Sequence, residues 1–487
     1  MRPQRAAGAL VAAGWLTTRV LMAAVWWYRC QYIAADVSYY FAQLHQNLRP
    51  PLSEYPTPIL WLMRLIDLAA GGNQTAFIDL VVALMVALDA AVTVALFLRA
   101  SAVAAGFWVV FLALLGPILW FRIDLIPAAC VTLALLWLKQ KPVISGSMLA
   151  IGAATKLWPA LLILPLLGKG RAARHRLAGF VVTGAVTALA SLVVNGWARS
   201  VSPITWQTDR GLQIESLWAT WPMIRHAIDP GICIVQMSKY NAYQVYGPGV
   251  TTGMSAASLM MDIAFVFAAV VTGMLVLWPM VLAPLLRRWR HTAAPAVSGR
   301  HGYAMLLSAT AIILTMIAAN KTFSPQYLIW LAGPLGLILA RAKTVGERRA
   351  AVWVAVLGCT AAGLTQSEFP LNYGGLVSDL SGDVGVTSIL VARNLLIACL
   401  TVLLMVWALI AAWRTIRPSR RQVRQLAHQA AARRAAHHPA AHPPVAHPAV
   451  ARPEVAKPID QSDTFDPRLE TASVSPGQML DRCGILD

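Results

Sequence analysis

Charged residues are scarce in this chain of 487 residues, which is 13% charged and 58% hydrophobic. Acids are the scarcer kind, with 21 Asp and Glu against 40 Lys and Arg. Soluble domains carry about 25% charged residues, so the composition excludes an ordinary soluble protein. Cysteine is scarce too, and the six cysteines have no metal-ligand spacing. We therefore predict no metal-binding residues and no cofactor. Whether the reaction requires a metal ion is a question that composition leaves open.

Long apolar runs take the place of charge, and those at residues 76–98, 259–286 and 389–413 are apolar on every face. Runs of about 20 such residues span a bilayer core. Only helices and closed barrels satisfy their backbone in lipid, and barrel strands would alternate in polarity. The sequence predicts an all-α, polytopic transmembrane protein. About ten full spans are expected, at residues 7–28, 76–98, 102–121, 124–139, 174–196, 256–286, 302–319, 324–340, 349–366 and 387–413.

The net charge of +19 would suggest nucleic acid in a soluble protein. Here the Lys and Arg residues cluster between spans, which indicates topology instead, and no nucleic-acid partner is expected. If these clusters face the cytoplasm, the spans alternate consistently and both termini are cytoplasmic in a multi-pass cell-membrane protein. Residues 142–168 are basic at both ends, so they are expected to form a re-entrant pair of short helices.

Two parts of the chain differ in composition. Residues 1–413 are expected to form the membrane domain, and residues 414–487 a cytoplasmic tail. The tail is rich in Ala, Pro and His and cannot bury enough apolar surface to fold, so it is expected to be disordered. The first external segment, residues 29–75, is expected to carry two helices that lie on the membrane surface.

Asp36 is the most informative acid, because it follows the first span directly and precedes an aromatic stretch. A carboxylate that a polytopic scaffold holds at the membrane surface is a candidate reaction centre. Tyr39, Tyr40 and Tyr55 suit a sugar or lipid pocket, since aromatic rings stack on the apolar faces of sugars. Taken singly, each tyrosine is better explained by interfacial anchoring.

A second cluster surrounds Arg210 in the expected external segment 197–255. Gln213, Glu215 and Ser216 supply the mixed donors and acceptors that a polyhydroxylated ligand needs. A polar helix on the membrane surface would carry similar residues, so composition leaves both readings open.

A third cluster runs from Asn320 to Gln326, at the expected outer junction of two spans. Lys321 suits a phosphate, and the Ser324-Pro325 pair can open a helix whose free N–H groups favour an anion. A snorkelling lysine is the alternative. Lys156, at the tip of the expected re-entrant pair, is costly there unless it has a partner.

Arg19 and Asp89 each lie near the middle of an expected span. Charges inside a membrane are usually paired, so a structural ion pair between them is favoured over a substrate role. Arg122 and Asp124 flank a tight external hairpin, where they could complete the outer site or cap a helix.

At these motifs the chain resembles the GT-C class of membrane glycosyltransferases. More narrowly it resembles glycosyltransferase family 87, the actinobacterial polyprenol-phosphate-mannose-dependent mannosyltransferases. The stretches that carry the resemblance are Asp36 after the first span, Arg122–Ala128, Ala154–Leu167, Arg210–Ser216 and Asn320–Leu335. It implies a GT-C-like fold with Asp36 as the catalytic base.

The function expected on this basis is transfer of a sugar, mannose first, from a polyprenyl-phosphate donor to a lipid-linked glycan or lipoglycan acceptor. Transfer would occur on the extracytoplasmic face and invert the donor linkage to an α-mannoside. Lys321, Arg210 and Lys156 are the candidates for binding the donor phosphate. The substrate candidates are Tyr39, Tyr40, Tyr55, Gln213, Glu215, Ser216, Asn320 and Gln326. The alternatives are an arabinose or glucose donor, and a polytopic transporter.

Overall fold

The computed structural model describes residues 2–46, 50–168, 170–206, 210–282, 300–378 and 382–416, and His428. The described helices and strands all belong to one compact unit within residues 1–427. The expected tail, residues 414–487, lies outside the described residues beyond Ile416, apart from His428.

Eight helices of the described chain are long and apolar enough to cross a membrane, by length and composition. The all-α, polytopic architecture expected from the sequence is thus confirmed. The eight are α1 (Arg2–Arg29), α4 (Gln74–Arg99), α5 (Ala102–Leu115) with its 3-10 extension η2 (Gly116–Trp120), α9 (Arg171–Thr205), α11 (Val250–Thr272) with the π-helical η5 (Gly273–Leu282), α13 (His301–Ala319), α15 (Val345–Glu368) and α17 (Val384–Ile416).

Local sequence explains where several of these helices begin. Asn73 accepts a hydrogen bond from the backbone N–H of Ala76 at the start of α4, and Ser101 accepts one from Ala104 at the start of α5. At the start of α15, Thr344 and Glu347 form a reciprocal capping box. Each cap satisfies backbone donors that a helix start leaves free.

Two of the ten expected spans are not long helices. Residues 124–139 form α6 (Leu125–Leu136), which has 12 residues. Residues 324–340 form the 3-10 helix η6 (Pro325–Leu331) followed by α14 (Ala332–Arg341). Most side chains of α6 and α14 are buried inside the bundle. The two helices lie against each other, and Gly333 of α14 packs directly on Thr132 of α6. High hydropathy there marks protein interior, and the expectation of ten full spans was wrong on these two.

The remaining helices of the first half are short. They are η1 (Gln31–Ala34), α2 (Ala35–His45), α3 (Thr57–Ala70), α7 (Pro142–Thr155), η3 (Trp158–Leu162) and α8 (Ile163–Leu166). α2 and α3 occupy the segment for which surface helices were expected. α7 and the pair η3–α8 match the two short helices expected within residues 142–168.

A small unexpected region lies between α9 and α11. It contains η4 (Leu217–Ala219), α10 (Thr220–Ile228) and an antiparallel hairpin of β1 (Ile234–Met237) and β2 (Tyr243–Tyr246). The hairpin packs through a separate apolar cluster that includes Leu212, Val235, Val245 and Leu390. The short helix α16 (Gly374–Val377) contributes Leu376 to the same cluster.

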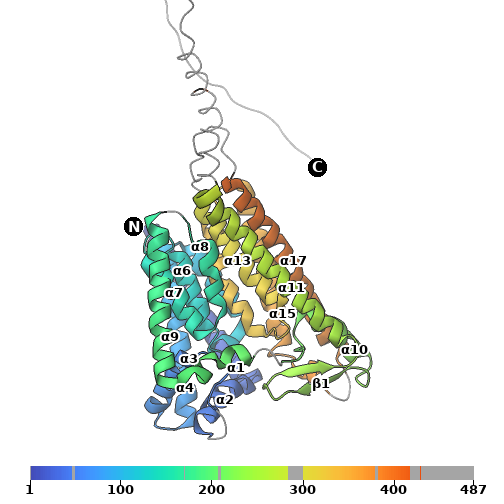
Figure 1. Ribbon diagram of the computed structural model, residues 1–487. Coiled ribbons are helices and arrows are strands. Elements are labelled where there is room, and N and C mark those ends of the chain that lie inside the picture. The colour runs from blue at the N-terminus through green and yellow to red at the C-terminus, as the bar shows by residue number, and fades with distance from the viewer. Residues whose placement is uncertain are drawn as a thin grey trace, which may run out of the picture. The chain divides into compact units, whose positions relative to one another are not determined.

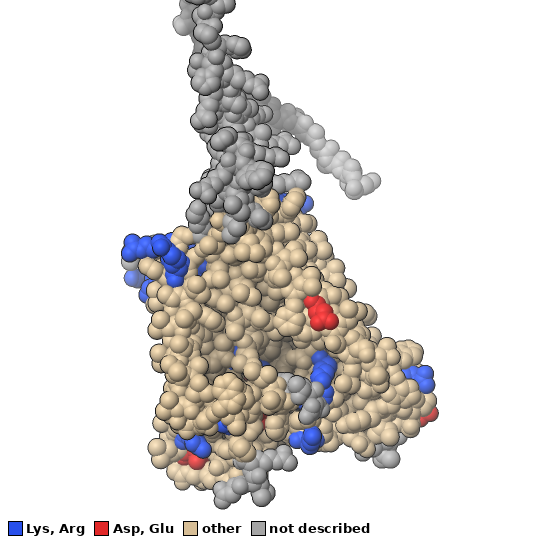
Figure 2. Space-filling model, in the orientation of Figure 1, with Lys and Arg blue, Asp and Glu red and all other residues tan. Residues whose placement is uncertain are grey.

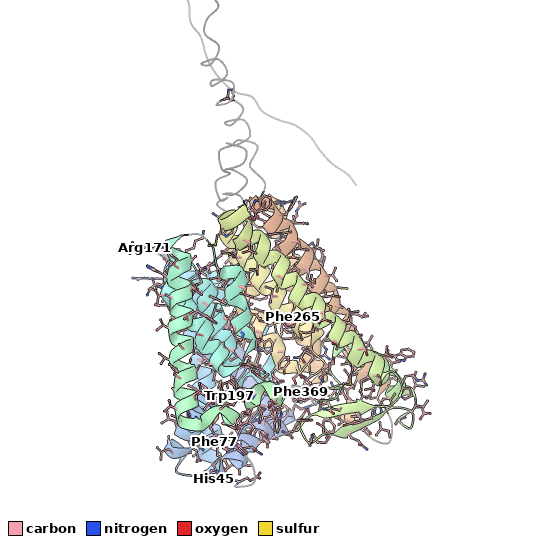
Figure 3. The ribbon with its side chains drawn as sticks, in the orientation of Figure 1. His45, Phe77, Arg171, Trp197, Phe265 and Phe369 are labelled. Carbon is pink, nitrogen blue, oxygen red and sulfur yellow. The ribbon has the colours of Figure 1, made fainter. Side chains whose placement is uncertain are left out.

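Figure 1 shows two helix groups. In one, α7 packs against α6 and α9, and in the other α13 packs against α11 and α17. α5 contacts α4 and α15; α4 in turn contacts α6 of the first group, and α15 contacts α17 of the second. The N-terminus and Arg171, at the start of α9, lie at one end of these helices, whereas His45, Phe77 and Trp197 lie toward the other (Figure 3).

Candidate active site

A cavity of about 1160 Å³ opens where many of the helix ends at this second end meet. Its wall comes from α2, the loop before α3, the tip of α7, the segment before η4, the hairpin, α11, and the segments around residues 320–330 and 369–377. Figure 2 shows a hollow in one face of the molecule with Lys and Arg side chains beside it. Phe369, labelled in Figure 3, is one of the lining residues.

The cavity brings together nearly all of the site residues that the sequence singled out. They come from segments more than 250 residues apart. Those that line it are Asp36, Tyr39, Tyr40, Tyr55, Lys156, Arg210, Gln213, Glu215, Asn320, Lys321 and Gln326. Ser216 does not line it: its hydroxyl donates to the backbone oxygen of Asn320 at 3.1 Å and caps η4. Ser216 therefore supports the wall.

Asp36 lies in the first turn of α2, after η1 has redirected the chain leaving α1. Its carboxylate forms an ion pair with Arg122, which sits in the hairpin between η2 and α6. The side chain of Asp36 is 25% exposed and that of Arg122 12%. The sequence anticipated both residues in external segments, but not that they would pair.

Arg122 is thus the ion-pair partner of Asp36, and it also lines the cavity. Burial lowers the pKa of Arg122 to about 10, while nearby Asp124 and Glu215 and the phenols of Tyr32 and Tyr373 oppose the shift. The guanidinium is therefore still charged at neutral pH. Within the described chain its Nε is buried with no hydrogen-bond partner.

Lys156 caps the C-terminus of α7 at the cavity, and it is not a free cation. Its Nζ lies 2.7 Å from Asp124 Oδ1, and it sits over the rings of Tyr327 and Trp330 at 4.2 and 5.1 Å. The indole N–H of Trp330 donates to the same Asp124 oxygen at 2.8 Å. Lys156 thus has the partner that its costly position requires, and Asp124 supplies it.

Lys321 and Arg210 lie on two segments from different halves of the chain, and both segments line the cavity. The backbone N–H of Gln213 donates to the carbonyl of Lys321 at 3.0 Å, and Gln213 Nε2 donates to Ser324 Oγ at 2.9 Å. Arg210 lies 5.6 Å from the ring centre of Tyr240. These contacts hold the two segments side by side at the cavity wall.

Glu215 belongs to a buried polar network that extends to α15 and α17. Burial raises the pKa of Glu215, although Tyr373 donates a hydrogen bond of 2.7 Å to its Oε1. Arg393 donates to the backbone oxygen of Glu215 at 2.8 Å and forms a 3.1 Å ion pair with Glu368, both side chains being fully buried. Sequence reasoning missed Arg393, although a charge inside the apolar run 387–413 was the signal that could have found it.

Glu54 is a further cavity acid that the sequence analysis did not single out as a ligand. Burial raises its pKa, opposed by a hydrogen bond with Tyr39 and by the charges of Arg199 and Arg210. Its loop is held by Arg199, whose guanidinium donates to the backbone oxygens of Tyr55, Pro51 and Leu52 at 3.1, 3.3 and 2.8 Å.

Arg199 reaches this loop because α9 breaks at Gly196, where φ is 74°. Only glycine adopts such a conformation without strain. The last turns of α9 can then lie against the loop instead of continuing straight. Ser202 adds a bond of 2.8 Å from its hydroxyl to the backbone oxygen of Ser53.

Arg19 and Asp89 lie away from the cavity, in the core between α1 and α4. Arg19 Nε and Asp89 Oδ2 are 2.7 Å apart, the pairing that the sequence favoured. Cys30 and Cys233 are both free and buried.

The chain was compared with known families, curated proteins and solved structures. The model of glycosyltransferase family 87 matches residues 54–222. The matched stretch includes Glu54, Arg122, Lys156, Arg210 and Glu215. Asp36 and Lys321 lie outside it and join it only in space. No curated protein and no solved structure matches. The match bears out the resemblance seen in the motifs: residues 54–222 are similar to glycosyltransferase family 87, which supports a membrane glycosyltransferase in general.

Proposed function

We propose that this chain transfers mannose from a polyprenyl-phosphate donor to a lipid-linked glycan or lipoglycan acceptor. The observation that carries the proposal is the shared cavity, in which a carboxylate, several cations and several tyrosines converge. Cations suit a phosphate leaving group, and rings and amides suit a sugar. The family match supports glycosyl transfer in general.

In the proposed reaction Asp36 is the general base. It takes the proton of the acceptor hydroxyl, whose oxygen forms a bond to the anomeric carbon of the donor sugar. The bond from that carbon to the phosphate oxygen breaks, and its electron pair leaves with the polyprenyl phosphate. A single displacement inverts the anomeric centre, so a β-linked donor gives an α-mannoside.

Lys321 and Arg210 are proposed to stabilise the negative charge that develops on the departing phosphate. Lys156 was the next candidate from sequence. Its pairing with Asp124 offsets its charge, so we assign it to the wall beneath the phosphate. Tyr39, Tyr40, Tyr55, Gln213, Glu215, Asn320 and Gln326 are proposed to contact the substrates.

The proposed orientation puts the cavity on the extracytoplasmic side of the cell membrane and both termini in the cytoplasm. Arg171 and the N-terminus lie at one end of the helices, whereas lining residues such as Phe369 lie toward the other (Figure 3). The positive-inside rule places the basic end in the cytoplasm. A lipid-borne donor then meets the cavity at the outer leaflet.

The decisive test is sugar transfer by membranes that carry the Asp36→Asn variant. Asn keeps the shape but loses basicity, so the turnover should fall about 100-fold or more. Asp79→Asn is the matched control, because Asp79 is an exposed acid near the start of α4 that does not line the cavity. Near-normal transfer by a correctly inserted Asp36→Asn chain would exclude Asp36 as the base.

The sugar is tested in the same membranes with three donors, polyprenyl-phosphate mannose, arabinose and glucose. Mannose transfer alone supports the proposal. Transfer of arabinose or glucose in its place assigns the chain to a different donor while leaving the cavity mechanism intact.

A further inference from the structure

The cationic side chains that line the cavity differ in their interaction partners. Among the described residues, those lining it are Arg29, Arg122, Lys156, Arg210 and Lys321. Lys156 forms an ion pair with Asp124, and Arg122 forms one with Asp36.

These two pairs have different surroundings. Asp124 is 3% exposed and also accepts the Trp330 indole N–H, so its pair with Lys156 is closed on several sides. The carboxylate of Asp36 is 25% exposed, and both Asp36 and Arg122 line the cavity. A ligand in the cavity can therefore reach both members of the Asp36–Arg122 pair, whereas only Lys156 of the other pair lines the cavity and its carboxylate partner Asp124 is covered.

The guanidinium of Arg122 has capacity to spare. It presents five N–H donors. Its Nη1 meets Asp36 and, at 3.4 Å, the backbone oxygen of Phe121. Its Nε is buried and unpartnered as far as the described residues extend. An arginine with unused donors in a cavity is well suited to a phosphate, which it can bind through two parallel hydrogen bonds.

The same ion pair limits Asp36 as a base. A carboxylate paired with an arginine is stabilised in its charged form, so it binds a proton weakly. A base in this state would act poorly on an acceptor hydroxyl. The groups that face the pair are Tyr32, Asp124, Glu215 and Tyr373, with Lys156 behind Asp124.

We infer that the Asp36–Arg122 ion pair is the resting state of the site, and that the donor phosphate displaces Asp36 from Arg122. This rests on the proposed function. Arg122 then becomes a phosphate ligand, and Asp36 becomes a free base only once a donor is bound. The ion pair thus couples donor binding to activation of the base and imposes an order, donor first and acceptor hydroxyl second.

The test is binding of polyprenyl phosphate, the leaving product, to the purified full-length chain in detergent. No transfer is needed, so the readout is independent of activity. Arg122→Gln should weaken binding about tenfold or more, because a charge-assisted contact is lost. Asp36→Asn should tighten binding severalfold, because the competitor for Arg122 is gone.

Simple charge repulsion between Asp36 and phosphate would also tighten binding in Asp36→Asn, and the double variant separates the two explanations. If Asp36 competes for Arg122, adding Asp36→Asn to Arg122→Gln gives no further gain. If Asp36 only repels the phosphate, the gain persists without Arg122. Persistence of the gain, or unchanged binding in Arg122→Gln, overturns the inference.

Arg122→Lys guards against misfolding of the glutamine variant, since it keeps the charge but loses the planar fork. We expect it to bind more weakly than the native chain, and native-like binding would count against the inference. Failure of the native chain to bind polyprenyl phosphate at all would instead refute the proposed donor. Sugar transfer by the native chain, measured in parallel, distinguishes that failure from failure of the inferred coupling.

Discussion

Among the described residues Asp and Arg form two ion pairs, Asp89–Arg19 and Asp36–Arg122, and the two differ in their surroundings. Asp89 accepts four bonds of 2.7–2.9 Å, from Arg19 Nε and Nη2 and from the indoles of Trp15 and Trp108. Arg19 Nη1 donates in turn to Val109 and Thr18. Each carboxylate oxygen of Asp89 thus accepts two hydrogen bonds, and Asp89 is fully buried.

The Asp36–Arg122 pair is open by comparison. It faces the cavity, and Arg122 keeps a buried donor without a partner in the part of the chain described. Completeness of hydrogen bonding, more than burial or charge, separates the pair that holds the fold from the pair available for chemistry. The predictions below test that distinction, starting with the largest expected effect.

Breaking the closed pair should cost the most stability. Asp89→Ala leaves Arg19 charged and uncompensated in the core, which costs about 3–5 kcal/mol. Thermal unfolding in detergent should show a large loss in Tm or no folded protein at all. Asp36→Ala, its counterpart in the open pair, should change Tm little. An equal loss of Tm in both variants would show that the two ion pairs do not differ in their contribution to stability.

Arg199 is expected to give an intermediate effect, because it positions the Glu54–Tyr55 loop without forming an ion pair in the cavity. Arg199→Gln frees the carbonyls of Pro51, Leu52 and Tyr55, and a displacement of about 1 Å at a site can cost about 100-fold. Transfer kinetics should show a 10- to 100-fold loss in kcat/KM. Arg64→Gln is the control, since Arg64 is an exposed cation on α3.

Arg199→Lys adds a second check on this loop. It keeps the charge but cannot reach three carbonyls with a planar fork, so it should recover little of the activity. Full recovery by Lys would show that charge, and not the clamp, is what the loop needs.

Glu215 should give the smallest effect, on the pH dependence of stability. Burial raises its pKa above the ordinary value of 4.5, so the folded state holds the proton more tightly than the unfolded state. This contribution is full below pH 4.5 and is lost as pH rises through the raised value. Glu215→Gln should therefore show a shallower fall of Tm with rising pH, and Glu54 should contribute with the same sign.

The pH scan has a clear contrary result. An identical slope of Tm against pH in the native chain and in Glu215→Gln would show that burial does not raise the pKa of Glu215. Asp229→Asn, an exposed acid outside the cavity, should leave the slope unchanged.

Sequence was sufficient for the membrane class and for most of the cavity residues, because apolar length and isolated polar clusters are local signals. Asp36, Lys321 and Glu215 each stood out in their own segments. The pairings did not, since Asp36 meets Arg122 and Lys156 meets Asp124 only through the packing of separate helices.

Hydropathy also could not tell lipid-facing helices from buried ones. α6 and α14 are as apolar as true spans, yet they are short and enclosed. The β1–β2 hairpin escaped notice because strands of four residues carry too little alternation to recognise. Arg199 lay in a segment read as the edge of a loop, where no local feature indicates a clamp.

The contact between Gly333 and Thr132 has a consequence for how this sequence can vary. A methyl group on Gly333 would overlap the Thr132 side chain, which itself is fully buried. Enlarging position 333 is therefore tolerable only together with a smaller residue at position 132. Among relatives that keep this helix crossing, positions 132 and 333 should therefore covary, which would couple the evolution of α6 to that of α14.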